Sequence, residues 1–180
     1  MTFPFGYDPA IAGDEYYAKE DNGTPGHSTG YITFGKPGDL MNKYIKFTPI
    51  PTTSQQSQFY DVVITGISVA GKNLPIKSSI YTKGGAVMDS GTVITRLQLK
   101  AYAVLRSAFR KEMSRYKIAT PGRNTDTCYD FSSYETVVCF AFTAVGEGDG
   151  AILGNLMQRS VQVVHDVEGG RVGFGPGTCT

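Results

Sequence analysis

The sequence predicts a mainly β domain with one main α-helix, over about residues 98–113. Turn-forming residues recur every few positions, with 22 Gly and 9 Pro among 180 residues, and the segments between them alternate or run apolar like short strands. Only one stretch has apolar residues at helical spacing. The composition, with 41% hydrophobic and 18% charged residues, is that of a globular chain, and 180 residues are enough for one buried core.

The expected strands are short and stand in the first half of the chain and at its end. They cover residues 31–34, 44–47, 60–69, 74–76, 161–165 and 171–174. Gly66 shifts the alternation within its strand, which is typical of a β-bulge. Glu168-Gly169-Gly170 joins the last two strands, so the chain is expected to end in a β-hairpin.

The helix prediction depends on an apolar stripe formed by Tyr102, Leu105 and Phe109. Arg106 and Arg110 are expected on its solvated face. Residues 29–180 are expected to form one domain, because no repeat or long linker divides them. Residues 1–28, an N-terminal arm rich in glycine and acidic residues without a strong period, are expected to be poorly ordered.

Composition excludes several classes of function. The net charge is +1 and there is no long charged run, so we expect neither a nucleic-acid nor a membrane partner. The longest apolar stretch, residues 137–145, is far shorter than the roughly 20 residues of a membrane-spanning helix. The first residues have neither the basic segment nor the apolar core of a signal peptide, so the chain as written is expected to have no secretion signal.

The cysteines permit two interpretations. Cys128, Cys139 and Cys179 have no paired Cys-x-x-Cys spacing, and the chain has 2 His, so we expect neither a metal site nor a cofactor. Cys128 and Cys139 flank strand-forming residues and would close a hairpin disulfide in an oxidising compartment. Three reduced thiols in a cytosolic chain fit the composition equally well.

The segment GAVMDSGTVITRL, residues 85–97, contains the strongest chemical signal in the sequence. An apolar strand ends at Asp89, in a turn that Gly91 permits, with the hydroxyls of Ser90 and Thr92 nearby. Such an arrangement suits a carboxylate that exchanges protons with water. Acid and base work by carboxylates needs two of them sharing one proton, and the chain has only one Asp-Ser/Thr-Gly. The alternative is an ordinary turn aspartate.

Several segments, in the same order, resemble the C-terminal lobe of pepsin-like (family A1) aspartic proteases, in the plant nepenthesin-like branch. The resemblance extends over roughly residues 29–179 through FYDVVITGISVAGKNLPI, AVMDSGTVITRL, AYAVLRSAFRKEM, TCYDF, VCFAF, AILGN and VVHDVEGGRVGFGPGTC. Several segments that match the family in the same order over this length identify it far more specifically than any single motif does. It implies a single lobe of the pepsin-like acid protease fold, a β-barrel with one main helix.

The resemblance also implies roles for individual residues. Asp89 would be one of two water-activating aspartates, and Thr92 would hydrogen-bond its carboxylate. Ser90 would reach across the junction between two lobes, and the Gly91 amide would help to orient the pair of aspartates. Ile152, Leu153 and Gly154 would support the loop without taking part in the chemistry. Cys128 and Cys139 would form a disulfide.

The chain also departs from the family pattern. We expect a truncated member of the family, because no N-terminal lobe with its own aspartate precedes the match. Other turn aspartates lack the Ser/Thr-Gly that follows Asp89. It is also internally shortened, since family strands are missing near residues 137–138. Loss of strands exposes ladder edges and core. A second protease lobe, either another copy or a separate N-terminal lobe, is therefore the expected partner besides a polypeptide substrate.

Two functions of different class follow. The first is an aspartic endopeptidase lobe that hydrolyses peptide bonds with Asp89 and a second aspartate from another lobe. The second is an inactive binding or inhibitor-like protein of the xylanase-inhibitor type, or a family fragment without function. The resemblance points to the secretory route or a plastid, whereas the missing signal favours the cytosol.

Two competing motifs are weaker. Gly146, Gly148 and Ala151 fit the spacing of a dinucleotide loop, but acidic residues within it would repel a pyrophosphate and no adequate helix follows. A Ser/His/Asp triad would need Ser90 and His165, yet Ser90 is not on a strand-to-helix elbow. His165 alternates with valines and is expected at a core edge or on the surface.

Overall fold

The computed structural model describes residues 44–51, 59–82, 84–122, 125–134, 136–146, 148–159 and 161–176. The predicted N-terminal arm and the predicted strand at 31–34 lie outside these ranges. The described residues are mainly β, with one long helix, as the sequence predicts.

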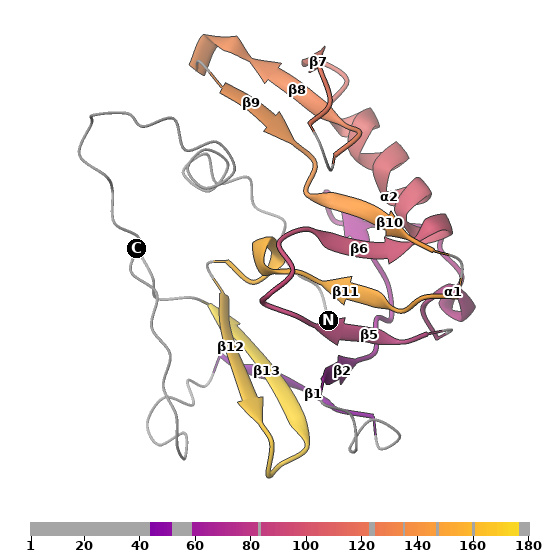
Figure 1. Ribbon diagram of the computed structural model, residues 1–180, viewed down its shortest axis with the longest axis vertical. Coiled ribbons are helices and arrows are strands. Elements are labelled where there is room, and N and C mark those ends of the chain that lie inside the picture. The colour runs from indigo at the N-terminus through magenta and orange to yellow at the C-terminus, as the bar shows by residue number, and fades with distance from the viewer. Residues whose placement is uncertain are drawn as a thin grey trace, which may run out of the picture.

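A five-stranded sheet at the centre of Figure 1 holds the Asp-Ser-Gly-Thr segment. Its strand order is β10 (Phe142–Val145), β6 (Thr95–Gln98), β11 (Ala151–Leu153), β5 (Ala86–Met88) and β2 (Tyr60–Val62). β11 pairs with β5 in parallel and meets β6 antiparallel at Ile152, so it lies between the strands on either side of Asp89.

Three smaller sheets surround the central one. The C-terminal hairpin is confirmed, with β12 (Val161–Asp166) and β13 (Arg171–Pro176) joined by β1 (Lys46–Pro49). β3 (Ser68–Val69) and β4 (Lys72–Asn73) form a short hairpin. β7 (Lys117–Ala119), β8 (Cys128–Phe131) and β9 (Thr136–Cys139) form the third sheet, which projects beyond α2 in Figure 1.

None of these sheets closes on itself within the described ranges, so the expected β-barrel is not found there. The strand predicted at 60–69 is also wrong, because β2 ends at Val62 and β3 begins only at Ser68. Residues 74–76 are not a strand; the chain pairs earlier, at β4, after a turn in which Ala70 and Gly71 have φ of 49° and 76°. This left-handed turn brings the hairpin back two residues sooner than the apolar pattern suggests.

The long helix is α2 (Leu99–Glu112), within one residue of its predicted ends. Ala101, Tyr102 and Leu105 are its buried residues and pack into the core with Phe140 and Phe142. A second, short helix, α1 (Ser78–Thr82), lies between β4 and β5. Two short 3₁₀ segments, η2 (Ser132–Tyr134) and η3 (Asn155–Met157), follow β8 and β11. Neither α-helix of the described ranges has the length and apolar run of a membrane crossing.

The basic residues of α2 do not form a merely solvated face, which corrects the sequence interpretation. Arg106 forms an ion pair with Asp126, and Arg110 donates from Nε to the Thr127 hydroxyl at 3.0 Å. Tyr102 donates its hydroxyl to Asp126 Oδ1 at 2.6 Å. Helical periodicity cannot reveal these bonds, because the segment before β8 supplies the partners. They attach α2 to that segment.

Cys128 and Cys139 are joined by a disulfide between directly opposite positions of β8 and β9. The pairing is the one that the family resemblance implies. Residues 137–138, where family strands are expected to be missing, lie within β9, which pairs along its whole length with β8. Between the two strands the structure describes the 3₁₀ segment η2.

Candidate active site

Asp89 lies at the end of β5, in a tight turn that leads to β6. Its two carboxylate oxygens each accept one hydrogen bond from the turn. The Gly91 N–H donates to Oδ1 at 2.8 Å, and the Thr92 hydroxyl donates to Oδ2 at 2.7 Å. An added Cβ on Gly91 would lie only 3.1 Å from Oδ1, so glycine at this position allows the backbone to approach the carboxylate closely.

These bonds favour the ionised carboxylate. The Thr92 hydroxyl, followed by the Gly91 amide, lowers the pKa of Asp89 below its ordinary value. Asp89 is only partly buried and Gly91 is exposed, so water can reach the carboxyl group. The turn therefore holds a solvent-accessible carboxylate in its charged form at neutral pH.

Strand β11 and the residues after it lie against this turn. The Asp89 N–H donates to the Leu153 carbonyl at 3.1 Å, next to Ile152, which pairs with Val87 of β5. The Asn155 N–H donates to the Thr92 carbonyl at 2.7 Å. The predicted Ile-Leu-Gly segment thus contacts both the start and the end of the turn.

Gly154 lies very close to the backbone that follows Asp89. An added Cβ would lie 2.7 Å from the Thr92 carbonyl oxygen, 2.8 Å from that of Val93 and 2.9 Å from the Ile94 carbonyl carbon. The Gly154 N–H donates to the hydroxyl of fully buried Thr95 at 3.0 Å. A residue with a side chain would push the two segments apart, so the shape of the turn depends on glycine here.

Ser90 is exposed at the tip of the turn. Its carbonyl oxygen accepts a hydrogen bond from Asn155 Nδ2 at 3.4 Å. Its hydroxyl makes no hydrogen bond to the described part of the chain. The side chain is therefore available to an outside group.

A small cavity of about 180 Å³ opens beside Asp89 and Ser90, and the sequence does not predict its other walls. Tyr60, Met88, Gln158 and His165 are among them. The rings of Tyr60 and His165 are 4.1 Å apart, and burial lowers the pKa of His165. No local signal marks Tyr60 or His165, because β2 and β12 come beside Asp89 only through the fold.

The structure does not support the dinucleotide loop or the Ser/His/Asp triad considered from the sequence. Ala151 begins strand β11 and not the helix that a dinucleotide loop requires. Ser90 and His165 line the same cavity, but no hydrogen bond joins them within the described ranges, so the base needed by a serine nucleophile is not in place. Among the described residues, no group of three or more His, Cys, Asp or Glu is placed to hold a metal ion.

Comparison with known proteins gives consistent results. Residues 59–136 match the family described as xylanase inhibitor C-terminal. The chain is 39% identical over 183 residues to an aspartyl protease family protein of Arabidopsis thaliana, covering 84% of this chain and 38% of the relative. It is 42% identical to the aspartyl protease AED1 of the same plant, covering 85% and 39%, and 25% identical to nepenthesin-2 of Nepenthes gracilis, covering 73% and 38%.

A solved structure titled as that of edgp has the same fold, with a TM-score of 0.63 at 17% identity over 76% of this chain and 46% of that one. Together with the Asp-Ser-Gly-Thr turn, these matches define the class: the chain belongs to the family of pepsin-like aspartic proteases. It corresponds to the C-terminal lobe of the plant nepenthesin-like branch. The chain spans less than two fifths of the length of the relatives named here.

Proposed function

We propose that this chain is one lobe of an aspartic endopeptidase, in which Asp89 is one of two carboxylates that activate water. The observation that supports this most strongly is the Asp89 carboxylate itself, which accepts the Gly91 amide and the Thr92 hydroxyl while remaining accessible to water. An ordinary turn aspartate uses its side chain to cap its own turn. Here the turn is additionally held from outside by Leu153, Gly154 and Asn155.

In the proposed reaction, the ionised Asp89 takes a proton from water, whose oxygen attacks the peptide carbonyl carbon. A second, protonated carboxylate gives its proton to the carbonyl oxygen. The tetrahedral intermediate, whose carbon now carries two hydroxyl groups, then collapses: the carbon–nitrogen bond breaks, and the leaving nitrogen takes up from Asp89 the proton that water lost. One hydroxyl returns its proton to the second carboxylate as the carbon–oxygen double bond re-forms. The lowered pKa of Asp89 favours it as the ionised member of the pair.

The second carboxylate must come from a second lobe, since the chain has a single Asp-Ser/Thr-Gly sequence. Either another copy of this chain or an N-terminal lobe would supply it. The exposed Ser90 hydroxyl is suited to a hydrogen bond across that junction. Ile152, Leu153 and Gly154 act in this proposal as support for the turn.

A second candidate is a binding protein without turnover. The match of residues 59–136 to a domain described by xylanase inhibition favours it. In that case Asp89 would be a structural remnant, and the chain would inhibit a glycosidase through its surface.

The deciding experiment is hydrolysis of a denatured protein at about pH 4, near ordinary carboxylate pKa values. The purified chain is compared with its Asp89→Asn variant, with and without pepstatin. Pepstatin-sensitive cleavage that the variant loses, and that rises more steeply than the protein concentration, supports a protease assembled from two copies. Cleavage that appears only after a relative's N-terminal lobe is added supports the other assembly.

No cleavage under either condition contradicts the protease proposal. Inhibition of a xylanase that persists in Asp89→Asn then supports the binding protein. Loss of inhibition in that variant, or its absence in both proteins, contradicts the second candidate.

A further inference from the structure

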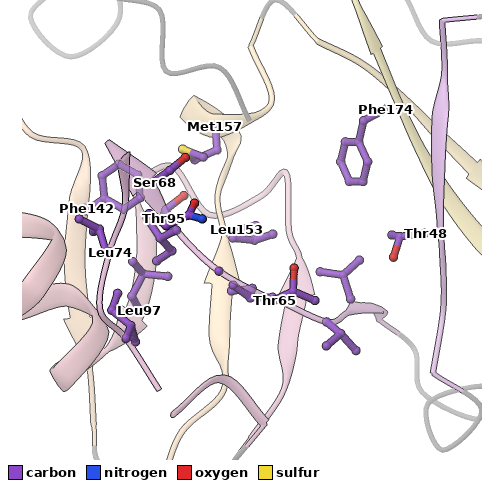
Figure 2. Close-up of a pocket in the computed structure, with 17 residues that line it drawn as sticks. Thr48, Thr65, Ser68, Leu74, Thr95, Leu97, Phe142, Leu153, Met157 and Phe174 are labelled. Carbon is purple, nitrogen blue, oxygen red and sulfur yellow. The ribbon is translucent and has the colours of Figure 1, made fainter. Parts of the chain in front are cut away.

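A second cavity, of about 380 Å³, lies between the central sheet and the sheet of β1 and β13, away from Asp89. Figure 2 shows Phe174 and Thr48 on one side of it and Leu74, Leu97 and Phe142 on the other. Its volume lies within the range of natural small-molecule sites, which hold about 300–1,000 Å³. The cavity is partly open to solvent, because Thr65, Gly66 and Asn73 of its lining are exposed.

The described walls are uncharged and combine apolar with polar side chains. No Asp, Glu, Lys, Arg or His is among the described residues that line the cavity. Leu97, Phe142, Leu153 and Phe174 are buried apolar side chains around it. A charged ligand would lose part of its hydration here without gaining an ionic partner from the described walls, so these walls favour an uncharged molecule.

Several hydrogen-bonding groups are placed among these apolar side chains. The side chains of Thr48, Ser68 and Asn73 line the cavity, and none of them makes a hydrogen bond to the described part of the chain. In Figure 2, Thr48 and Ser68 lie on different sides of the cavity. Walls that combine apolar side chains with free polar groups are a common composition of small-molecule sites.

We propose that this cavity binds a small, uncharged, mainly apolar molecule with one hydrogen-bonding group. At about 30 Å³ for each water-sized unit, the space holds on the order of ten non-hydrogen atoms. A bicyclic aromatic ring or a short aliphatic alcohol has this size. The proposal is independent of proteolysis, because no lining residue belongs to the Asp89 turn.

The site shares two residues with the support of that turn. Thr95 lines the cavity and accepts the Gly154 N–H, and Leu153 lines the cavity while its carbonyl accepts the Asp89 N–H. A bound molecule therefore contacts the layer directly beneath the candidate active site.

Indole is the probe for the test, because it is uncharged, has one N–H donor and fluoresces, and the protein contains no Trp. Wild-type chain is expected to bind indole with a blue shift of its emission, and to bind indole-3-carboxylate far more weakly. In a chain with ¹³C-labelled methionine methyl groups, the Met157 signal is expected to move. Met88 and Met113, which do not line the cavity, are expected to stay in place.

Gly66 offers a matched pair of variants. It lines the cavity, an added Cβ there meets no atom within 4 Å, and its φ is not in the left-handed region. Gly66→Leu is expected to fill the space and lower indole affinity at least about tenfold, whereas Gly66→Ala should retain most of it. Circular dichroism checks that both variants are folded.

Three results would overturn the proposal. They are no indole binding by the wild-type chain, equal binding by Gly66→Leu and Gly66→Ala, or a shift of Met88 or Met113 in place of Met157. The first of these results includes the case of a chain that excludes indole because it is already dimeric, with the cavity filled by a partner side chain. Sedimentation of the same sample detects that case.

Discussion

Gly154 donates its backbone N–H to the Thr95 hydroxyl at 3.0 Å, across 59 positions of sequence. This bond joins β11 to the strand that follows the Asp89 turn, and both partners are buried. The turn is thus shaped by a segment far away in the chain as well as by its own residues.

Gly154→Ala is expected to destabilise the protein by about 1–3 kcal/mol, because the new methyl group would overlap the Thr92 and Val93 carbonyl oxygens. Urea unfolding measures the change. Gly66→Ala is the control, since its Cβ meets open space. Equal stabilities of the two variants would show that the close approach at Gly154 is not needed.

Thr92→Val is expected to raise the pKa of Asp89, because the hydroxyl that stabilises the carboxylate is lost while the side-chain shape is kept. Thr92→Ser should keep the pKa low. Carboxyl-carbon NMR of Asp89 against pH provides the measurement. An unchanged pKa in Thr92→Val would mean that the hydrogen bond contributes nothing in solution.

The lowered pKa of Asp89 also predicts how the free energy of unfolding changes at acid pH. A carboxyl group with a folded-state pKa below its unfolded value stabilises the fold above the unfolded value, and this contribution is lost as pH falls through the folded pKa. Asp89 and Asp166 both have lowered pKa values, the latter through Arg171. The free energy of unfolding is therefore expected to decrease below about pH 4. Replacing Asp166 by Asn should flatten that decrease, and an unaltered slope would contradict its assignment to this carboxyl group.

For Tyr102 we expect the opposite dependence, in which the free energy of unfolding decreases as the pH rises into the alkaline range. Burial, followed by the hydrogen bond to Asp126, raises its pKa from 10.0 to about 12. A raised folded-state pKa stabilises the fold below the unfolded value, and this stability is lost as pH rises through the folded value. The free energy of unfolding should fall between about pH 10 and 12, and less steeply in Tyr102→Phe. At neutral pH the variant should lose about 1–3 kcal/mol, because Asp126 loses a donor.

The disulfide closes a loop with a sequence separation of 11. Its removal in a Cys128→Ser, Cys139→Ser double variant is expected to cost about 2–4 kcal/mol, chiefly because the unfolded chain gains freedom. Thermal unfolding with and without a reducing agent tests this. The wild-type chain should lose stability on reduction, whereas the double variant should not respond. A wild-type chain indifferent to the reductant would contradict the expectation.

Features that depend on neighbouring residues could be predicted from the sequence. The apolar stripe of Tyr102 and Leu105 located α2 to within one residue, and alternation located the C-terminal hairpin. The long strand expected at 60–69 and the strand at 74–76 were wrong, because sheet pairing decides where a strand ends and alternation does not register the partner. The sheets of the described ranges remain open for the same reason, since closure depends on distant strands.

For the candidate site, the sequence alone determined what lies within three residues of Asp89: the turn, the Gly91 amide and the Thr92 hydroxyl that hold its carboxylate. Only the tertiary structure decided that Gly154, from a distant segment, packs closely against the turn and that Tyr60 and His165 line a cavity beside it. Short-range hydrogen bonds follow from residue type and turn geometry, because the chain itself sets their distances. Contacts between distant strands depend on how sheets pair and pack, which no local pattern records.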